Sequence, residues 1–271
     1  MKAKQKNKYK FWLILFIAIF ITSSLIGFIF RRPIIYYAKV VYHKTFNFSS
    51  PDFKSEYKTS NLEDIFIPDG YVYGLDISRH QGIVDWVKLS EYRFRYHKID
   101  FVYIKATESD DWTDKNFKKN WAAAKKFGFV RGAYHFFDPV ETPEKQMQNF
   151  FSRVKIEEGD LAPMLDVEQQ SSISTSEYRR KVLRCLQLLE RHYKLKPILY
   201  VNKDFYESYF STNEFKPYPL WMSSLLTKTP KQQHWVFWQF AHTGIVPGIS
   251  EYVDVNVFNG SAEDFNILKK D

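Results

Sequence analysis

The sequence predicts an α/β fold, a barrel of the β/α type whose last third has lost its helices. Eight short apolar segments are typical of strands, and predicted helices follow the second to the fifth of them. Beyond the fifth strand the remaining segments are joined by loops with little room for helices. A flat, doubly wound sheet is the alternative arrangement of the same elements.

The eight strands are recognised as short runs rich in branched and aromatic residues, bounded by polar or glycine-containing turns. They span residues 73–78, 100–106, 130–136, 161–168, 197–201, 219–223, 235–240 and 252–258.

Helices are predicted between the strands from the apolar period and from start signals. Asp114 is expected to cap a helix with apolar residues Phe117, Trp121 and Ala124, and Gly128 to end it. Thr142 and Pro143 have the types that begin the next helix. Two more helices are expected over residues 176–193 and near residues 204–210.

The N-terminal part differs in composition from the rest. Residues 1–10 form a lysine-rich tail, and residues 11–30 are an uncharged, almost wholly apolar run long enough to cross a bilayer as a helix. We expect a transmembrane anchor, with a cleaved signal segment as the alternative. Residues 31–70 are predicted to be a stalk, and residues 71–271 the barrel domain.

The positive charge of the chain lies in this N-terminal part. The formal net charge is +8, but residues 1–44 hold nine basic residues and no acidic ones. The remainder therefore has 39 − 9 = 30 basic and 31 acidic residues, a net charge of −1. A neutral globular part argues against nucleic acid as a partner. The lysines before the apolar run favour a cytoplasmic N-terminus, which places the barrel domain outside the cytoplasmic membrane.

Cys185 is the only cysteine, so the chain can form no internal disulfide. It shares a helical face with Val182, Leu186 and Leu189, which predicts a core position.

The segment 161–168 carries the strongest chemical signal. It is apolar until Asp166 and Glu168, which flank Val167. In a strand the two acids point to the same side, ~6.6 Å apart along the backbone. Two close carboxyls push their pKa values apart, which can supply an acid and a base at neutral pH. The alternative is a strand that ends in ordinary surface acids.

Nearly every other predicted strand delivers an acid, an amide or an aromatic residue at the same end. Barrel enzymes place their chemistry at the carboxyl ends of the strands, so these residues are candidates for one site. Besides the two acids above, they are Asp76, Glu108, Tyr134, His135, Tyr200, Asn202, Trp238, Gln239, Asp254 and Asn256.

This mixture of residues fits carbohydrate chemistry. Acids and amides bind sugar hydroxyls, aromatic rings pack on sugar C–H faces, and glycosidic cleavage needs a carboxylic acid to protonate the leaving oxygen. The sequence contains no phosphate-binding glycine loop, no GxSxG motif and no HExxH zinc motif. The scattered His80 and His135 do not predict a metal site, and no cofactor is expected.

The motifs in order resemble those of the glycoside hydrolase family 25 muramidases, the Chalaropsis-type lysozymes. The resemblance covers residues 73–260. It rests on Gly-Leu-Asp-Ile-Ser at 74–78 with Gln81-Gly82, Asp85-Trp86, Ile-Lys-Ala-Thr-Glu at 104–108, Gly-Ala-Tyr-His-Phe at 132–136, Leu-Asp-Val-Glu at 165–168, Trp238-Gln239 and Val-Asp-Val-Asn-Val-Phe at 253–258.

The resemblance implies a TIM-like barrel of modified (β/α)5(β)3 type and cleavage of the β-1,4 bond between N-acetylmuramic acid and N-acetylglucosamine in peptidoglycan, without a metal. It implies that Glu168 is the proton donor, that Asp166 orients the acetamido group and stabilises the transition state, and that Asp76 and Asp254 complete the acidic floor. The chain departs from the family pattern at Ser-Asp-Asp-Trp (109–112) and at Trp-Met-Ser-Ser (221–224).

The alternatives are a hydrolase of chitin or other N-acetylglucosamine polymers, and a glycan-binding module that has lost turnover. No carboxylate of the family set is missing, which favours an enzyme. We expect a monomer that binds peptidoglycan strands and is held at the membrane by residues 11–30. The backbone spacing of Asp166 and Glu168 leaves the retaining and inverting outcomes open.

Overall fold

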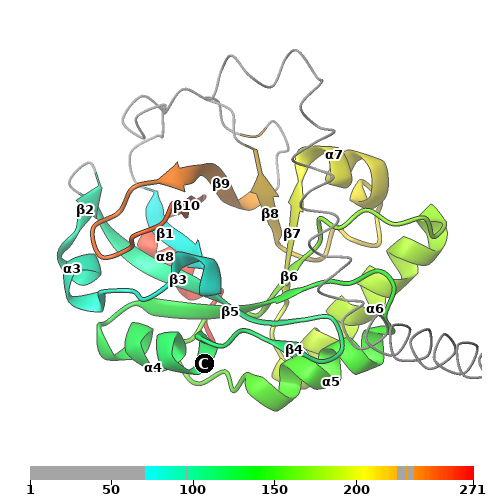
Figure 1. Cartoon of the computed structure of the whole chain (residues 1–271). Coiled ribbons are helices and arrows are strands. Elements are labelled where there is room, and N and C mark those ends of the chain that lie inside the picture. The colour runs from blue at the N-terminus through cyan, green and yellow to red at the C-terminus, as the bar shows by residue number, and fades with distance from the viewer. Residues whose placement is uncertain (1–70, 95–96, 225–229, 231–234) are drawn as a thin grey trace, which may run out of the picture. The chain divides into compact units, whose positions relative to one another are not determined.

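The computed structural model of the chain describes residues 71–94, 97–224, 230 and 235–271. Eight strands form a closed barrel in these residues (Figure 1). In chain order they are β1 (Val72–Ile77), β3 (His97–Glu108), β5 (Val130–Phe136), β6 (Met164–Asp166), β7 (Ile198–Asn202), β8 (Leu220–Ser223), β9 (Trp235–Gly244) and β10 (Val253–Phe258). The predicted barrel is thus confirmed, and the flat sheet is excluded because β1 pairs with both β3 and β10.

One strand of the barrel, β10, runs opposite to the other seven. Neighbouring strands from β1 through β3 to β9 are parallel, whereas β10 is antiparallel to both β9 and β1. The rim formed by the carboxyl ends of the parallel strands therefore receives the amino end of β10. Asp254 and Asn256 had been expected at the carboxyl end of the eighth strand, and the structure corrects this: they lie near its beginning.

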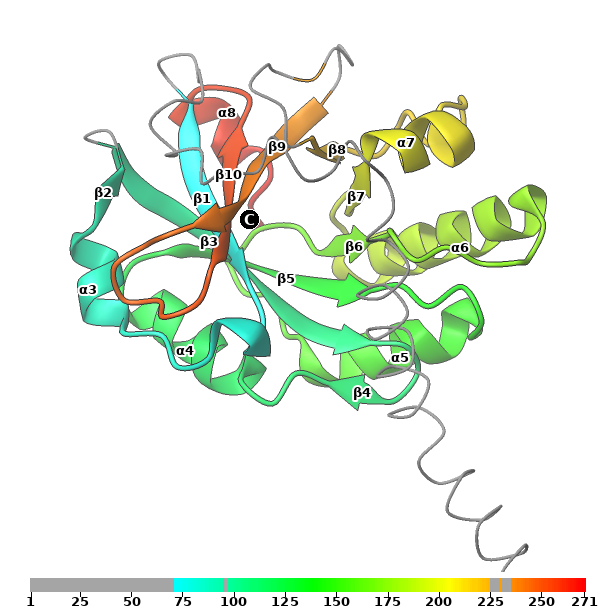
Figure 2. The same cartoon turned by 45° about the horizontal axis from the view of Figure 1, so that its top comes forward.

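Helices follow the first five strands of the barrel and cover its outside (Figure 2). They are α3 (Trp86–Glu91), α4 (Phe117–Lys126), α5 (Pro143–Arg153), α6 (Thr175–Tyr193) and the short α7 (Lys203–Phe205), which continues into η4 (Tyr206–Phe210). Between β8 and β10 the described residues contain no helix. The (β/α)5(β)3 arrangement is therefore confirmed.

The sequence did not reveal the smallest elements. They are η3 (Arg79–Gln81), β2 (Arg93–Phe94), β4 (Trp112–Thr113) and the C-terminal α8 (Ala262–Asn266), and α3 was also missed. Each spans six residues or fewer, too short to show a period.

Helix starts differ from expectation in detail. Asp114 does not cap α4, because the helix begins after Asn116. The Asp114 carboxylate instead accepts hydrogen bonds from the backbone N–H groups of Arg79 and Asn116, and so ties the end of β1 to the loop before α4. The α6 helix begins at Thr175, one residue before the expected start, and Ser174 caps it by accepting from the Glu177 N–H. Cys185 is fully buried on the inner face of that helix, as predicted.

Aromatic rings fill the interior of the barrel. Phe101, Tyr103, Trp221 and Phe237 are fully buried there and pack edge-on or stacked against one another. Glycines make room for these rings: a Cβ on Gly74 would lie 2.3 Å from Phe101, and one on Gly132 would lie 2.3 Å from Tyr103. A second core lies between the strands and the helices.

A buried ion pair closes the barrel at the end opposite the carboxyl rim. Arg131 on β5 donates to both carboxylate oxygens of Asp160 at 2.7 and 3.0 Å, and both side chains are 5% exposed. The backbone of Asp160 accepts from the Lys270 N–H, and Leu161 bridges to Lys269. The pair therefore holds the C-terminal segment against the barrel.

Neither the predicted membrane span at 11–30 nor the predicted stalk at 31–70 falls within the described residues. In the part of the chain that the structure does describe, no helix is both long and apolar enough to cross a membrane.

Replacing Asp160 by alanine is expected to lower the free energy of unfolding by roughly 3 kcal/mol, because the buried Arg131 charge would lose its bidentate partner and keep only the more exposed Glu157 carboxylate. Glu144 provides the matched control, since it pairs with Arg184 on an exposed surface. Glu144→Ala should cost about 0–1 kcal/mol. Urea unfolding measures both values. Equal losses for the two variants would contradict this account of the barrel end.

Candidate active site

Asp166 and Glu168 occupy the carboxyl end of β6, as predicted. Asp166 is the last residue of the strand and is 8% exposed. The Val167 N–H donates to the Tyr200 carbonyl at 2.9 Å, which continues the strand pairing beyond Asp166. Val167 is fully buried in the outer core, so Asp166 and Glu168 turn toward the opposite, inner side. Glu168 as a whole residue is exposed to solvent, whereas its carboxyl lies close enough to the buried acids to be desolvated.

Asp76 and Asp254 lie opposite each other on β1 and β10. Asp76 is buried, and its Oδ2 accepts from Asn256 Nδ2 at 2.9 Å and from Gln239 Nε2 at 3.0 Å. Asp254 hydrogen-bonds the same carboxylate. One buried carboxylate therefore collects donors from three side chains on two neighbouring strands.

Gln239 is held from the other side by two hydroxyl groups. The Tyr200 hydroxyl and the Ser223 hydroxyl each donate to Gln239 Oε1 at 2.9 Å. An amide oxygen has two acceptor positions, so both are used by protein. The sequence placed Gln239 among the substrate-binding residues. The structure instead makes it a support for the Asp76 carboxylate.

The acids raise one another's pKa values in this setting. Burial raises the pKa of Asp166 well above its ordinary value, and the negative charge of Glu168 adds to the effect. Burial, and after it the charge of Asp76, raises the pKa of Glu168. Burial and the Asp76 charge raise the pKa of Asp254 to about 9. The group can therefore hold protons at neutral pH, as a general acid must.

Asp76 differs from the other three acids in its hydrogen bonds. Burial raises its pKa, while the bonds from Asn256, Gln239 and Asp254 act in the opposite direction. The bond between the two aspartates lowers the pKa of Asp76 and raises that of Asp254. This is the pattern of a protonated Asp254 donating to an ionised Asp76.

Lys105 is a neighbour of the acids that the sequence-based selection left out. Its ammonium pairs with Glu108 at 2.8 Å and lies 4.4 Å from the centre of the Phe136 ring. Its charge lowers the pKa values of Asp166 and Glu168 and so opposes the effect of burial. The strand-end segment Lys-Ala-Thr-Glu contained this residue, but a buried lysine beside acids cannot be told from a surface lysine in sequence. Glu108 is thus placed at the rim by an ion pair.

Tyr134 and Tyr200 face the acids from β5 and β7. Burial raises the pKa of both hydroxyls well above the ordinary value, and the negative charges of Asp76, Asp166 and Glu168 add to the effect. Both tyrosines therefore stay neutral and can act as hydrogen-bond donors. Asn202, two residues beyond Tyr200, caps α7 by accepting from the Phe205 N–H.

Two predicted site residues, His135 and Trp238, face the outside of the barrel rather than the acids. His135 is fully buried, with its ring nitrogens bonded to Thr107 at 2.7 Å and Gln146 at 3.1 Å, and burial lowers its pKa to about 4. Trp238 is fully buried in the outer core and donates to the Ser224 carbonyl at 2.7 Å. Each follows or precedes an inward-facing neighbour, so it must point outward. Both expectations are corrected: these residues are structural.

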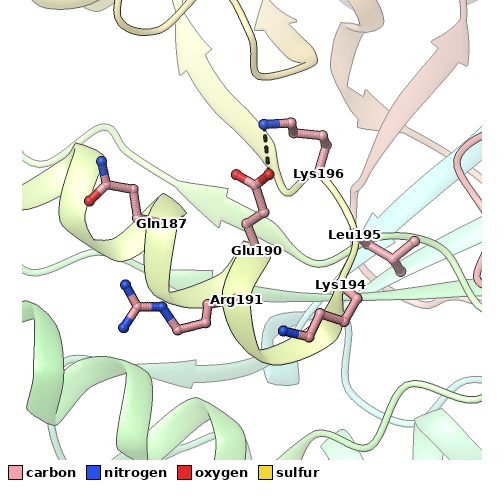
Figure 3. A pocket seen from close by; sticks show the side chains of 6 residues that line it. All are labelled: Gln187, Glu190, Arg191, Lys194, Leu195 and Lys196. Carbon is pink, nitrogen blue, oxygen red and sulfur yellow. Dashed lines mark ion pairs between the residues drawn. The ribbon is translucent and has the colours of Figure 1, made fainter.

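Two hollows on the surface lie apart from the acids. One of about 690 Å³ is lined by Gln187, Glu190, Arg191, Lys194, Leu195 and Lys196 at the end of α6 (Figure 3). Lys196 pairs there with Glu190 at 2.7 Å. A second hollow, of about 390 Å³, lies between the β3–β4 turn and α5. Neither is lined by Asp76, Asp166, Glu168 or Asp254. Among the described residues, no group of three or more potential ligands is arranged to hold a metal ion.

A (β/α)5(β)3 barrel with a set of acids of raised pKa at its carboxyl rim defines a hydrolase of the glycosidase class. Comparison with known proteins identifies it further. Residues 75–249 match the family model of the glycosyl hydrolases family 25, so the chain belongs to that family. It is a muramidase-type glycoside hydrolase.

Individual relatives agree with this assignment. The chain is 36% identical to the uncharacterized protein YegX of Escherichia coli K12 over 203 residues, 74% of each chain. It is 27% identical to lysozyme M1 of Streptomyces globisporus, over 70% of this chain and 69% of that protein. A family 25 glycosyl hydrolase structure from Bacillus anthracis superimposes with a TM-score of 0.67 and 30% identity, covering 76% of this chain and 97% of the other.

The raised pKa of Asp254 predicts a stability that falls as pH rises. Between the pKa of an unfolded aspartate, about 3.9, and the folded value of about 9, the folded protein holds a proton that the unfolded chain has released. In Asp254→Asn the side-chain amide can still donate to Asp76, but it carries no proton that titrates. We expect the free energy of unfolding of the wild type to fall more steeply from pH 5 to pH 9 than that of Asp254→Asn.

Chemical denaturation at pH 5, 7 and 9 measures this difference. The exposed Asp204 of α7 gives the matched control, and Asp204→Asn should follow the wild-type slope. If Asp254→Asn also has the wild-type slope, Asp254 does not hold the proton.

Proposed function

We propose that this protein is a lysozyme that cleaves the β-1,4 bond between N-acetylmuramic acid and N-acetylglucosamine in peptidoglycan. The observation that carries the proposal is the position of Glu168. Glu168 is an exposed residue at the barrel rim, and the desolvation of its carboxyl beside the buried acids, with the charge of Asp76, raises its pKa. A protonated acid that a glycan can reach is what departure of the leaving sugar requires.

Glu168 acts in this proposal as the general acid, and Asp166 orients the acetamido group of the substrate. One observation supports the role of Asp166: its Oδ1 is buried and has no hydrogen-bond partner among the described residues. A buried polar atom without a partner is costly, and a substrate amide can satisfy it. Asp76 and Asp254 form the acidic floor beneath the two.

Around these acids, Glu108, Tyr134, Tyr200, Asn202 and Asn256 are the proposed contacts to the glycan or to its immediate support. Tyr134 is the best-supported contact, because its neutral hydroxyl lies near all four acids. The aligned relative named lysozyme M1 supports the peptidoglycan substrate.

We propose further that residues 11–30 anchor the protein in the cytoplasmic membrane, with the barrel outside, as a monomer. The uncharged run of 20 residues and the five lysines before it support this orientation. Secretion after cleavage of the same segment is the alternative outcome.

The full-length protein, incubated in detergent with purified peptidoglycan, is expected to release fragments with new reducing ends at muramic acid. Glu168→Gln should lower the rate by about 10²–10⁴-fold and leave binding intact, because an amide cannot supply the proton. Mass spectrometry of the products identifies the new reducing ends and gives the rate. Glu144→Gln, on the exposed start of α5, is the control and should keep the wild-type rate.

Chitin oligomers are tested in parallel. Cleavage of chitin with intact peptidoglycan would replace the proposed substrate by an N-acetylglucosamine polymer. If Glu168→Gln cleaves as fast as the wild type, the assignment of the proton donor is wrong.

Membrane attachment predicts that the full-length protein stays in the membrane pellet after a high-salt wash and is released by detergent. Ile19→Arg with Ile21→Arg should move it to the supernatant, since each charge at the centre of a span costs about 2.5–3.5 kcal/mol. Immunoblots of the fractions report the distribution. Wild-type protein in the supernatant with an intact N-terminus would contradict the anchor, and a shortened N-terminus would show cleavage.

A further inference from the structure

Gln239 connects two hydroxyl groups to the buried carboxylate of Asp76. Its Oε1 accepts from Tyr200 and Ser223, and its Nε2 donates to Asp76 Oδ2. The amide is 5% exposed. An ionised carboxylate only accepts, so turning the side chain over would place Oε1 against the Asp76 oxygen; the amide therefore keeps Nε2 toward Asp76 and Oε1 toward the two hydroxyls, which donate to it.

The residues that hold Gln239 come from three strands. Tyr200 lies on β7, Ser223 at the end of β8, and Gln239 itself on β9. Ser223 is paired with Gln239 in the register of the two strands. Ser223 belongs to the segment 221–224 where the sequence departs from its family pattern, and the structure gives that serine a defined partner.

Asp76 receives a second amide at the same oxygen. Asn256 Nδ2 donates to Asp76 Oδ2 at 2.9 Å, and Asp254 also bonds to Asp76. Two N–H donors on one oxygen favour the ionised form of that carboxyl. The other aspartate of the pair then keeps the proton, because two adjacent carboxylates cannot both ionise easily.

We propose that Gln239 is a positioning residue, which Tyr200 and Ser223 hold in place so that its Nε2 donates to Asp76 and makes Asp76 the charged member and Asp254 the protonated member of the pair. The inference rests on the proposed function, since it specifies the charge beneath Glu168 during the reaction. It assigns no contact with substrate to Gln239. The pair then carries one negative charge, and that charge acts on Glu168 from below.

Other charged or titratable groups face this pair and belong in any account of its pH dependence. They are Tyr134 on β5, Asp166 and Glu168 at β6, and Tyr200 on β7, and Lys105 on β3 acts in turn on Asp166 and Glu168. None of them hydrogen-bonds Asp76 in the structure. Their charges act on it in the wild type and in the variants below, so a difference between those proteins reports on Gln239.

The test compares the pH profile of kcat/KM on peptidoglycan for full-length wild type and Gln239→Met. Methionine has a similar length but neither donates to Asp76 nor accepts from the two hydroxyls. Loss of a hydrogen bond to a charged group should move the acidic limb to higher pH by about one unit. The rate at the optimum should fall by about tenfold to a hundredfold.

Gln239→Glu provides the rescue that a merely structural role would not show. A protonated glutamic acid can accept from Tyr200 and Ser223 and donate to Asp76, whereas its carboxylate repels Asp76. Activity of Gln239→Glu should therefore be greatest at acidic pH and fall steeply as the pH rises. Gln187→Met, on the exposed face of α6, is the matched control and should leave the profile unchanged.

A second readout does not depend on turnover. In protein labelled with ¹³C at the aspartate carboxyl carbons, the lower of the two apparent pKa values of the Asp76–Asp254 pair should rise in Gln239→Met. If the wild type does not cleave peptidoglycan but this shift is found, the proposed function fails and the positioning role stands. If the wild type cleaves and neither profile nor titration moves, the positioning role is overturned.

Tyr200→Phe and Ser223→Ala cover the case in which Gln239→Met does not fold. Each removes one of the two bonds that orient the amide and leaves Gln239 in place. Both should shift the acidic limb in the same direction as Gln239→Met by a smaller amount, with a larger shift in the double variant. A lower rate with the wild-type pH profile in these variants would overturn the proposal.

Discussion

Strand β10 inserts between β9 and β1 and runs antiparallel to both, and this pairing closes the barrel. The amino end of β10 therefore meets the carboxyl ends of its neighbours. The pairing places Asp254 opposite Asp76 and Asn256 opposite Gly74. Without it the Asp76 carboxylate would lose two of its three partners. The acidic floor is thus a consequence of how the sheet closes.

Crowding of four acids at one rim is unfavourable for folding, and the surrounding residues reduce that cost in different ways. Amide donors stabilise the charge on Asp76, and Lys105 opposes the burial of Asp166 and Glu168. No comparable bond reaches Asp166 Oδ1. The unsatisfied polar atom therefore lies on an acid proposed to meet substrate, as is common where binding supplies the missing interaction. The buried aromatic interior of the barrel provides apolar burial that offsets part of this cost.

The sequence pattern identified the strands, but it assigned both of two adjacent residues at some strand ends to the site. Tyr134 and His135 were both chosen, as were Trp238 and Gln239, although adjacent residues of a strand face opposite sides. The interior of a barrel and its helix-covered outside are both apolar, so hydrophobic pattern does not show which residue of such a pair faces inward. A register shift between Lys105 and Thr107 adds to the difficulty, because it turns Thr107 toward His135.

The sequence by itself determined the order of strands and helices, the loss of helices after the fifth unit, and the family motifs with Asp166 and Glu168 at a strand end. These are local properties, set by residue types a few positions apart. Only the tertiary structure decided that Gln239 supports Asp76, that Lys105 stands beside the acids, and that His135 and Trp238 are buried outside the barrel. Those facts depend on contacts between residues up to 180 positions apart, such as Asp76 and Asn256, whose geometry follows from barrel closure.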